Sequence, residues 1–134
     1  MKYTLFLLVM ATSSLILTNK STAQSIDTAS YKYKLAKTWY FNYSEKFGVK
    51  VDPDSTQKKD IIVFTPDQTY KMISEGVNSN GTWNVSEASH FLTIVDSKTK
   101  QARSIKIVGL IKDQLALKWQ AADLTAVYKY YYAK

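Results

Sequence analysis

The residue types that most often carry out catalysis are scarce in this sequence. His90 is the only histidine, and the chain has no cysteine. A zinc site normally needs several nitrogen or sulfur ligands, and a nucleophile needs a base at a suitable spacing. The sequence has neither arrangement. We therefore predict that His90 is a surface residue, that no metal or cofactor is bound, and that the protein is not an enzyme.

The acidic residues lie mainly among turn-forming residues, where carboxylates commonly cap backbone N–H groups. They include Asp52, Asp54, Asp67, Glu87, Asp113 and Asp123. The segment that begins at Asp52 resembles the start of a calcium loop. Its twelfth position is Val63, however, where a calcium loop has a bidentate glutamate. Turn chemistry is thus the expected role of these acids.

Basic residues outnumber acidic ones by 18 to 11, which gives a net charge of +7. One basic group is Lys58 with Lys59, and a second contains Lys98, Lys100 and Arg103. Such groups can attract an anionic lipid, an acidic glycan or an acidic protein surface. Solvated loops and strand faces explain the same residues more simply. The sequence has no glycine-rich phosphate loop.

The N-terminus has the pattern of a secretory signal peptide. Lys2 precedes an interrupted apolar run that ends at Leu17, and small residues lead up to Ala23. The run is too short to span a bilayer, and no stop-transfer pattern follows it, so a retained anchor is the less favoured alternative. We predict a removable signal peptide at 1–23, a mature domain at 24–134, and export to the periplasm or the medium.

Cleavage would leave 111 of the 134 residues, which is enough for one domain with one core. The signal segment holds two lysines and no acid, so the mature chain would carry a charge of +5. We do not expect an exported domain of this modest charge to bind nucleic acid, nor to span a membrane after cleavage. Its stability must come from apolar burial and hydrogen bonding, since disulfides are excluded.

The rest of the chain alternates between strand-forming runs and turn residues. The eight runs are Lys37 to Tyr43, Asp60 to Thr65, Thr69 to Glu75, Gly81 to Ser86, Phe91 to Val95, Arg103 to Ile111, Leu115 to Gln120 and Thr125 to Tyr132. Short connectors, such as Gly76 to Asn80, favour antiparallel neighbours in chain order. The predicted fold is all-β, an eight-stranded antiparallel up-and-down barrel. Its closure would remove exposed strand edges.

Two segments flank or interrupt these strands. Ile26 to Leu35 is predicted to form a short helix or an ordered lead-in, with Ser25 or Asp27 as its cap. The long connector from Ser44 to Lys59 is expected to hang over one open end of the barrel. Both segments would then lie at the ends of the barrel.

Three short motifs resemble bacterial lipocalin-like domains of the calycin-type β-barrel superfamily. They are Leu35-Ala36-Lys37-Thr38-Trp39, Phe64-Thr65-Pro66-Asp67-Gln68-Thr69-Tyr70 and Gly81-Thr82-Trp83. In that superfamily a first-strand tryptophan closes one end of the barrel, and Trp39 matches it. Lys37 and Gln68 stand where the family usually has glycine. The resemblance covers most of the mature chain and implies a cavity for a small, mostly apolar molecule.

Alternation along the strands predicts which side chains point inward. The candidates to line a cavity are Trp39, Phe41, Tyr70, Met72, Trp83, Ile105, Ile107, Leu117, Trp119, Tyr128 and Tyr130. Lys129, between the last two, is expected to face water. Among the candidates, Tyr70, Tyr128 and Tyr130 would offer hydroxyl groups to a ligand.

Two functions remain open at this point. Eight strands form a barrel that is either filled by its own side chains or just wide enough for one small ligand. The first function is therefore the binding of a small apolar or amphipathic molecule. The second is a filled barrel that acts as a protein-interaction or envelope structural module, with a partner that the sequence does not identify.

Overall fold

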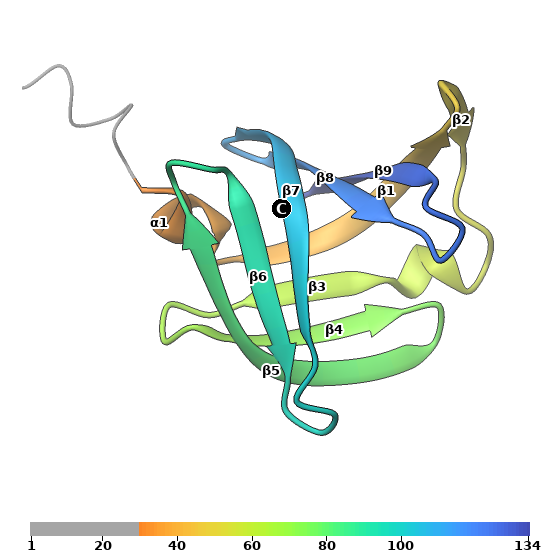
Figure 1. Cartoon of the computed structure of the whole chain (residues 1–134). Coiled ribbons are helices and arrows are strands. Elements are labelled where there is room, and N and C mark those ends of the chain that lie inside the picture. Colours follow the sequence, from red (N-terminus) through yellow and green to blue (C-terminus); the bar gives the residue numbers. More distant parts are fainter. Residues whose placement is uncertain (1–29) are drawn as a thin grey trace, which may run out of the picture.

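The computed structural model describes residues 30–134 (Figure 1). Its elements are α1 (Tyr31–Leu35), β1 (Thr38–Lys46), β2 (Val49–Val51), the 3-10 helix η2 (Gln57–Lys59), β3 (Ile61–Phe64), β4 (Thr69–Ser74), β5 (Val77–Ser86), β6 (Phe91–Asp96), β7 (Ala102–Ile111), β8 (Gln114–Gln120) and β9 (Ala126–Tyr132). The predicted signal peptide, 1–23, lies outside the described residues.

Eight of the strands form a closed ring. Strands β3 to β9 follow one another in chain order beside β1, and β9 pairs back with β1. Every pairing is antiparallel. This confirms the predicted eight-stranded antiparallel barrel. The ninth strand, β2, pairs only with the far end of β1 and lies outside the ring.

The long connector is more ordered than the sequence analysis expected. Phe47 and Gly48 form a tight turn with φ values of 53° and 74°, and β2 folds back on β1 as a hairpin. After β2, Asp54 Oδ1 accepts hydrogen bonds from the backbone N–H groups of Thr56 and Gln57 at 2.9 and 2.8 Å. Asp54 thus holds the turn that leads into η2.

The β4–β5 hairpin is tighter than predicted. Ser74 pairs with Val77, so the turn consists of Glu75 and Gly76 alone. Most of the predicted connector from Gly76 to Asn80 therefore belongs to β5. The polar residues in this segment are strand residues because pairing with β4 satisfies their backbone groups.

Helix α1 covers one end of the barrel, which we call the closed end. Ser30 is its N-cap, and the Ser30 hydroxyl accepts a hydrogen bond from the Tyr33 N–H at 3.4 Å. The helix ends in Leu35, which is fully buried, and the Leu35 carbonyl accepts a hydrogen bond from Trp39 Nε1 at 3.0 Å. This bond fastens the helix to the first strand, and it places Trp39 where the family resemblance implied.

The core fills the half of the barrel next to α1. Its buried residues come from every strand of the ring, and Phe64 and Trp83 meet edge to face with their ring centroids 5.2 Å apart. Trp83 Nε1 also donates a hydrogen bond to the Thr65 carbonyl at 3.1 Å. Burying one such large apolar side chain stabilises the fold by roughly 2 to 3 kcal/mol. The aromatic residues of the three motifs therefore contribute much of the stability of this half.

One glycine allows two strands to approach closely. Gly81 on β5 lies opposite Asp96 on β6, and Ser97 N–H donates to the Asn80 carbonyl at 2.9 Å. A Cβ atom on Gly81 would lie only 1.8 Å from the carbonyl oxygen of Val95. No side chain fits at this position without moving the backbone of β6.

Several acids cap turns, as predicted. Backbone N–H groups donate to the carboxylates of Asp67, Asp96 and Asp123 within their own turns. The pKa of Asp67 is lowered, mainly by hydrogen bonds from Thr65 and Thr69. Hydrogen bonds within their own turns likewise lower the pKa values of Asp96 and Asp123. These carboxylates are accounted for by turn structure.

Candidate functional site

Most of the predicted lining residues lie together on the inner face of the barrel. Trp39, Phe41, Tyr70, Trp83, Ile105, Ile107 and Leu117 are buried, whereas Met72 and Trp119 are half-buried and pack against the core. The first group belongs to the filled half of the barrel. Met72, Trp119 and one side of Phe41 lie nearer the opposite end, which we call the mouth.

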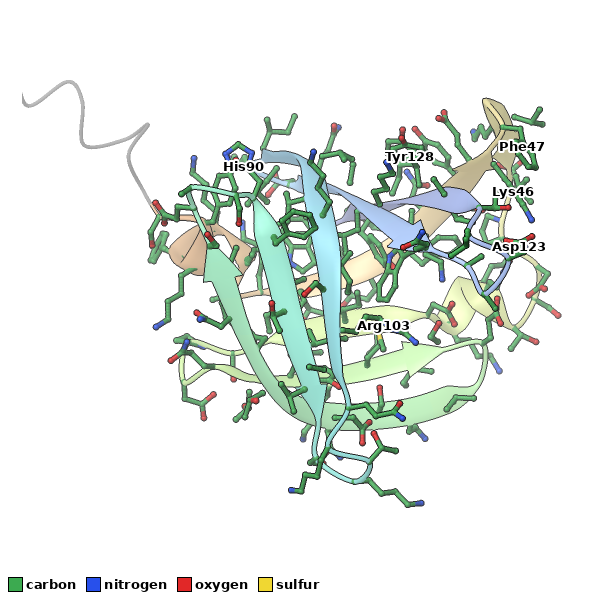
Figure 2. All side chains as sticks on the ribbon, viewed as in Figure 1. Lys46, Phe47, His90, Arg103, Asp123 and Tyr128 are labelled. Carbon is green, nitrogen blue, oxygen red and sulfur yellow. The ribbon has the colours of Figure 1, made fainter. Side chains whose placement is uncertain are left out.

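In β9, the side chains point to the opposite faces from those predicted. Leu117 is inside the barrel and pairs with Lys129, and directly paired residues of neighbouring strands share a face. Lys129 and the buried Tyr131 therefore point inward, whereas Tyr130 and Tyr128 point outward; Tyr128 is labelled in Figure 2. The inward direction predicted for these two tyrosines is wrong, as is the outward direction predicted for Lys129.

A bulge in β1 accommodates this register. Phe41 pairs with Tyr131, but Tyr43 pairs with Tyr130, so Asn42 is an extra residue on β1. The rings of Tyr43 and Tyr130 stack outside the barrel with their centroids 4.4 Å apart. The Tyr130 hydroxyl donates to Glu45 Oε2 at 3.2 Å, and desolvation, followed by the Glu45 charge, raises the pKa of Tyr130. The outer tyrosines thus form a structured surface ladder.

Two basic side chains lie near one indole ring at the mouth. Arg103 Cζ lies 5.5 Å from the ring centroid of Trp119, and Lys129 Nζ lies 5.4 Å from the same centroid. Arg103 faces inward because it pairs with the buried Ile94. Within residues 30–134 the single ion pair joins Lys50 and Asp52, so neither cation at the mouth has a carboxylate within 4 Å. The two positive charges are attracted to the ring but repel each other.

A buried acid and a buried phenol lie on the inner side of these cations. Asp60 is 6% exposed, and its Oδ1 accepts a hydrogen bond from the Glu75 N–H at 2.8 Å. Burial raises the pKa of Asp60, while that hydrogen bond and the charge of Lys129 act against the rise. Burial also raises the pKa of Tyr131, and the charge of Asp60 adds to this effect. The interior here is polar, unlike the filled half.

Two buried polar atoms in this region have no hydrogen-bond partner. They are Trp119 Nε1 and Ser79 Oγ, and Ser79 lies on the inner face opposite Met72. Trp119 Nε1 is near enough to the Tyr131 hydroxyl to lower its pKa slightly, but the two atoms do not have hydrogen-bond geometry. An unsatisfied buried polar group costs about 1 to 3 kcal/mol.

The barrel wall opens beside Trp119. The β7–β8 ladder extends only as far as the pair Lys106 and Lys118, so the residues of β7 before Lys106 and the end of β8 separate. A groove of 430 Å³ lies between them, lined by Arg103, Ile105 and Trp119 together with the β8–β9 turn. Leu124 of that turn is exposed at the groove. The separation gives a small molecule a route to Trp119 and Arg103.

Sequence reasoning identified Trp119 but not the polar groups around it. It assigned Arg103 to a surface basic group, Lys129 to the outer face and Asp60 to the start of a strand. The one available signal was the alternation of β8, because Trp119 follows the inward residues Leu115 and Leu117 at intervals of two. Extending that register to β9 would have placed Lys129 inside.

Within residues 30–134 no group of three or more histidine, cysteine or acidic side chains is arranged to hold a metal ion. His90 is exposed, as predicted, and its ring centroid lies 5.1 Å from that of Tyr31 on α1. In the same part of the chain, no helix is long and apolar enough to cross a bilayer.

Comparison with solved structures places the barrel among known folds. A lipocalin-like protein from Bacteroides uniformis superimposes with a TM-score of 0.57, at 12% sequence identity, over 75% of this chain and 99% of that protein. The fold is lipocalin-like. A DUF4847 family protein from Bacteroides vulgatus also matches, with a TM-score of 0.49 and 16% identity, over 75% of this chain and 94% of that one. No protein-family model and no curated protein matches the sequence.

Proposed function

We propose that this lipocalin-like barrel binds a small amphipathic anion at its mouth. The observation that carries the proposal is the pair of cations, Arg103 and Lys129, which both lie near the Trp119 ring with no carboxylate within 4 Å among the described residues. A carboxylate within reach of both would be attracted by both. It would also relieve their mutual repulsion.

The rest of the site suits the apolar part of such a molecule. Phe41, Met72 and Trp119 provide apolar surface on the inner face of the mouth. The adjoining groove of 430 Å³ falls within the usual size range of small-molecule sites, which combine apolar walls with a few polar groups. Since the opposite half of the barrel is filled, the ligand would be short and would lie near the mouth.

The export of the protein is part of the same proposal. The signal peptide predicted at 1–23 would deliver the barrel to the periplasm or the medium, where it would act as a carrier and not as a catalyst. Mass spectrometry of the protein purified from its host tests this directly. The expected mass is that of 24–134, and a protein that retains residues 1–23 would contradict export by cleavage.

The binding experiment compares octanoate with octanol, which share a chain length and differ in charge. Isothermal titration calorimetry should detect octanoate and find it bound more tightly than octanol. Replacing Arg103 or Lys129 with methionine removes a charge but retains a similar apolar stem. Because a charge-assisted hydrogen bond contributes about 1.5 to 3 kcal/mol, each variant should bind octanoate roughly 10- to 100-fold more weakly, with little change for octanol.

Matched controls exist on the same strands. Lys106 on β7 and Lys118 on β8 are exposed on the outer face, so Lys106→Met and Lys118→Met change the net charge equally without entering the mouth. These variants should bind octanoate like the wild type. Equal losses in the control and mouth variants would refute the proposed site, and so would the absence of saturable binding by any amphipathic anion.

A second candidate function is a protein-interaction module. It is favoured by the filled half of the barrel and by an outer groove of 320 Å³ whose walls include Tyr43, Tyr130 and Tyr132. Native mass spectrometry of the protein from its host distinguishes the two functions. A small stoichiometric mass that is lost on unfolding supports the carrier, whereas an apo barrel in complex with another protein supports the module.

A further inference from the structure

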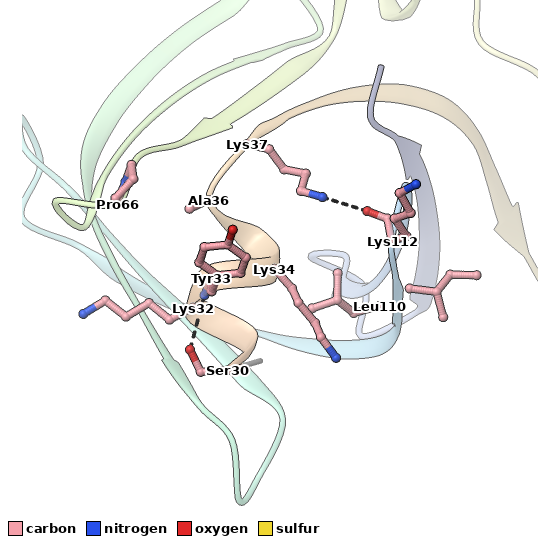
Figure 3. A pocket seen from close by; sticks show the side chains of 10 residues that line it. Ser30, Lys32, Tyr33, Lys34, Ala36, Lys37, Pro66, Leu110 and Lys112 are labelled. Atoms are coloured by element: carbon pink, nitrogen blue, oxygen red, sulfur yellow. Dashed lines mark hydrogen bonds between the residues drawn. The ribbon is translucent and has the colours of Figure 1, made fainter. Parts of the chain in front are cut away.

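A broad groove at the closed end, remote from the mouth, is lined by four lysines. They are Lys32 and Lys34 of α1, Lys37 after the helix, and Lys112 in the β7–β8 turn (Figure 3). The groove has a volume of 840 Å³, larger than the 430 Å³ groove at the mouth. Its position beside α1 means that two segments far apart in the sequence, 32–37 and the β7–β8 turn, bring these positive charges together.

The charge of this groove is of one sign. No acidic residue is among its lining residues, and none of the four lysines forms an ion pair within residues 30–134. Three acids lie near it: Asp67 and Asp113 adjoin lining residues in the chain, and Glu87 Oε1 accepts a hydrogen bond from the Tyr31 N–H of α1 at 2.9 Å. The Asp67 carboxylate is held in its own turn by Thr69. Lys37 Nζ donates to the Lys112 carbonyl at 2.8 Å, which ties the end of the helix to the turn.

Exposed apolar side chains accompany the lysines. Tyr33 is 77% exposed and Ile111 is 64% exposed, and both line the groove. Neither side chain is needed to fill the barrel, since the end of the core beneath them is closed by Leu35 and Trp39. Large apolar groups surrounded by lysines are typical of surfaces that rest on an anionic bilayer, where the apolar groups enter the interface and the lysines contact the headgroups.

We propose that the closed end docks onto the surface of a membrane that contains anionic phospholipids. Complementary charge supports this occupant, because four lysines without an acid among the lining residues match a sheet of phosphate groups better than a single small ion. Docking in this way leaves the mouth free and does not depend on the ligand proposed above.

The test measures cosedimentation of the mature protein with lipid vesicles. Vesicles of phosphatidylcholine with about one-third phosphatidylglycerol should bind the protein, and vesicles of phosphatidylcholine alone should not. Binding should weaken as salt rises from about 50 to about 200 mM, because the screening length becomes shorter. The triple variant Lys32→Gln/Lys34→Gln/Lys112→Gln should bind roughly 100-fold more weakly, since each lysine near an anionic surface contributes about fivefold.

The control is a second triple variant with the same loss of charge. Lys58, Lys59 and Lys98 are exposed, and they lie in η2 and the β6–β7 turn, away from α1. Lys58→Gln/Lys59→Gln/Lys98→Gln should retain binding to within a few-fold of the wild type. An equal loss in both triple variants would show that only net charge matters, and would overturn the proposal.

Two further arms separate a membrane surface from a soluble anion. Tyr33→Ser/Ile111→Ser keeps every lysine, and it should weaken vesicle binding if these side chains enter the interface. Inorganic phosphate at the same ionic strength as sodium chloride should compete no better than that salt. Specific displacement by phosphate, or unchanged vesicle binding by the double variant, would contradict docking on a bilayer. Circular dichroism of each variant verifies that the barrel is intact.

Discussion

Replacing Gly81 with alanine tests the close approach of β5 and β6. The added Cβ would lie 1.8 Å from the Val95 carbonyl oxygen, 2.9 Å from its carbon and 3.0 Å from Ser97 N. All three are backbone atoms of β6 or its turn, so no side-chain rotation can relieve the contact. The Val95 carbonyl must move by more than about 1 Å, because real Cβ contacts are essentially never shorter than 3.0 Å.

The expected loss of stability follows from the backbone groups that must move. Overpacking costs about 1 to 3 kcal/mol, and a displaced carbonyl loses one or two ladder hydrogen bonds at about 1 kcal/mol each. We therefore expect Gly81→Ala to lower the free energy of unfolding by about 3 kcal/mol. For a domain of this size the melting temperature should fall by roughly 10 to 20 °C. Urea denaturation followed by tryptophan fluorescence measures the change.

Gly109→Ala is the matched control. A Cβ at Gly109 would lie 3.5 Å from the Ala116 Cβ, which is an ordinary van der Waals contact. This variant should change the free energy of unfolding by less than about 0.5 kcal/mol. If the two glycine variants were equally stable, the strand approach at Gly81 would not be as tight as described, and the reasoning would be refuted.

Three further predictions concern the buried polar groups. The Asp60 pKa is raised above its ordinary value of 3.8, so the native state binds this proton more tightly than the unfolded state and is progressively destabilised as pH rises from about 4 through the native pKa. Asp60→Asn should therefore gain stability relative to the wild type over that range. Urea denaturation as a function of pH measures the difference in free energy of unfolding between the two proteins. That difference would not change with pH if Asp60 were not desolvated. Burial raises the pKa of Tyr131, so its phenol should ionise only on unfolding, and Tyr131→Phe should remove one late step from an alkaline absorbance titration; an unchanged late step would contradict this. Trp39→Phe removes the hydrogen bond to the Leu35 carbonyl and should cost about 2 kcal/mol, with faster amide exchange in α1; full protection of the helix would show that other contacts fasten it.

Much of the barrel could be predicted because each strand of the ring carries its own signal. Runs rich in aromatic and β-branched residues, separated by short turns, located all eight strands of the ring, and alternation placed Trp39, Tyr70 and Leu117 inside. The β1–β2 hairpin was missed because all three residues of β2 are exposed and its turn is Phe47-Gly48. Asn-Gly is the usual sequence for a turn in which both residues have positive φ.

The candidate site was predicted less well because its residues depend on pairing between strands. The run Tyr128 to Tyr132 is nearly uniform in character, so alternation within it gives no direction except at Lys129. A lone lysine is normally assigned to the outside. Its true direction is fixed by the pairing of Leu117 with Lys129 and by the bulge at Asn42, neither of which a single strand reveals. The same pairing gives the mouth its charge.

Closure of the ring by β1 and β9 has a consequence for how the protein folds. The Glu45–Tyr130 hydrogen bond joins residues separated by 85 positions, and the partner of the first strand is the last strand of the chain. Contacts of such long sequence separation slow folding, since a long loop must be closed before they form. Until β9 pairs with it, β1 has no partner along one side and the chain is an open sheet. A chain that ended before β9 would not form a smaller barrel but a sheet with two free edges, prone to aggregate.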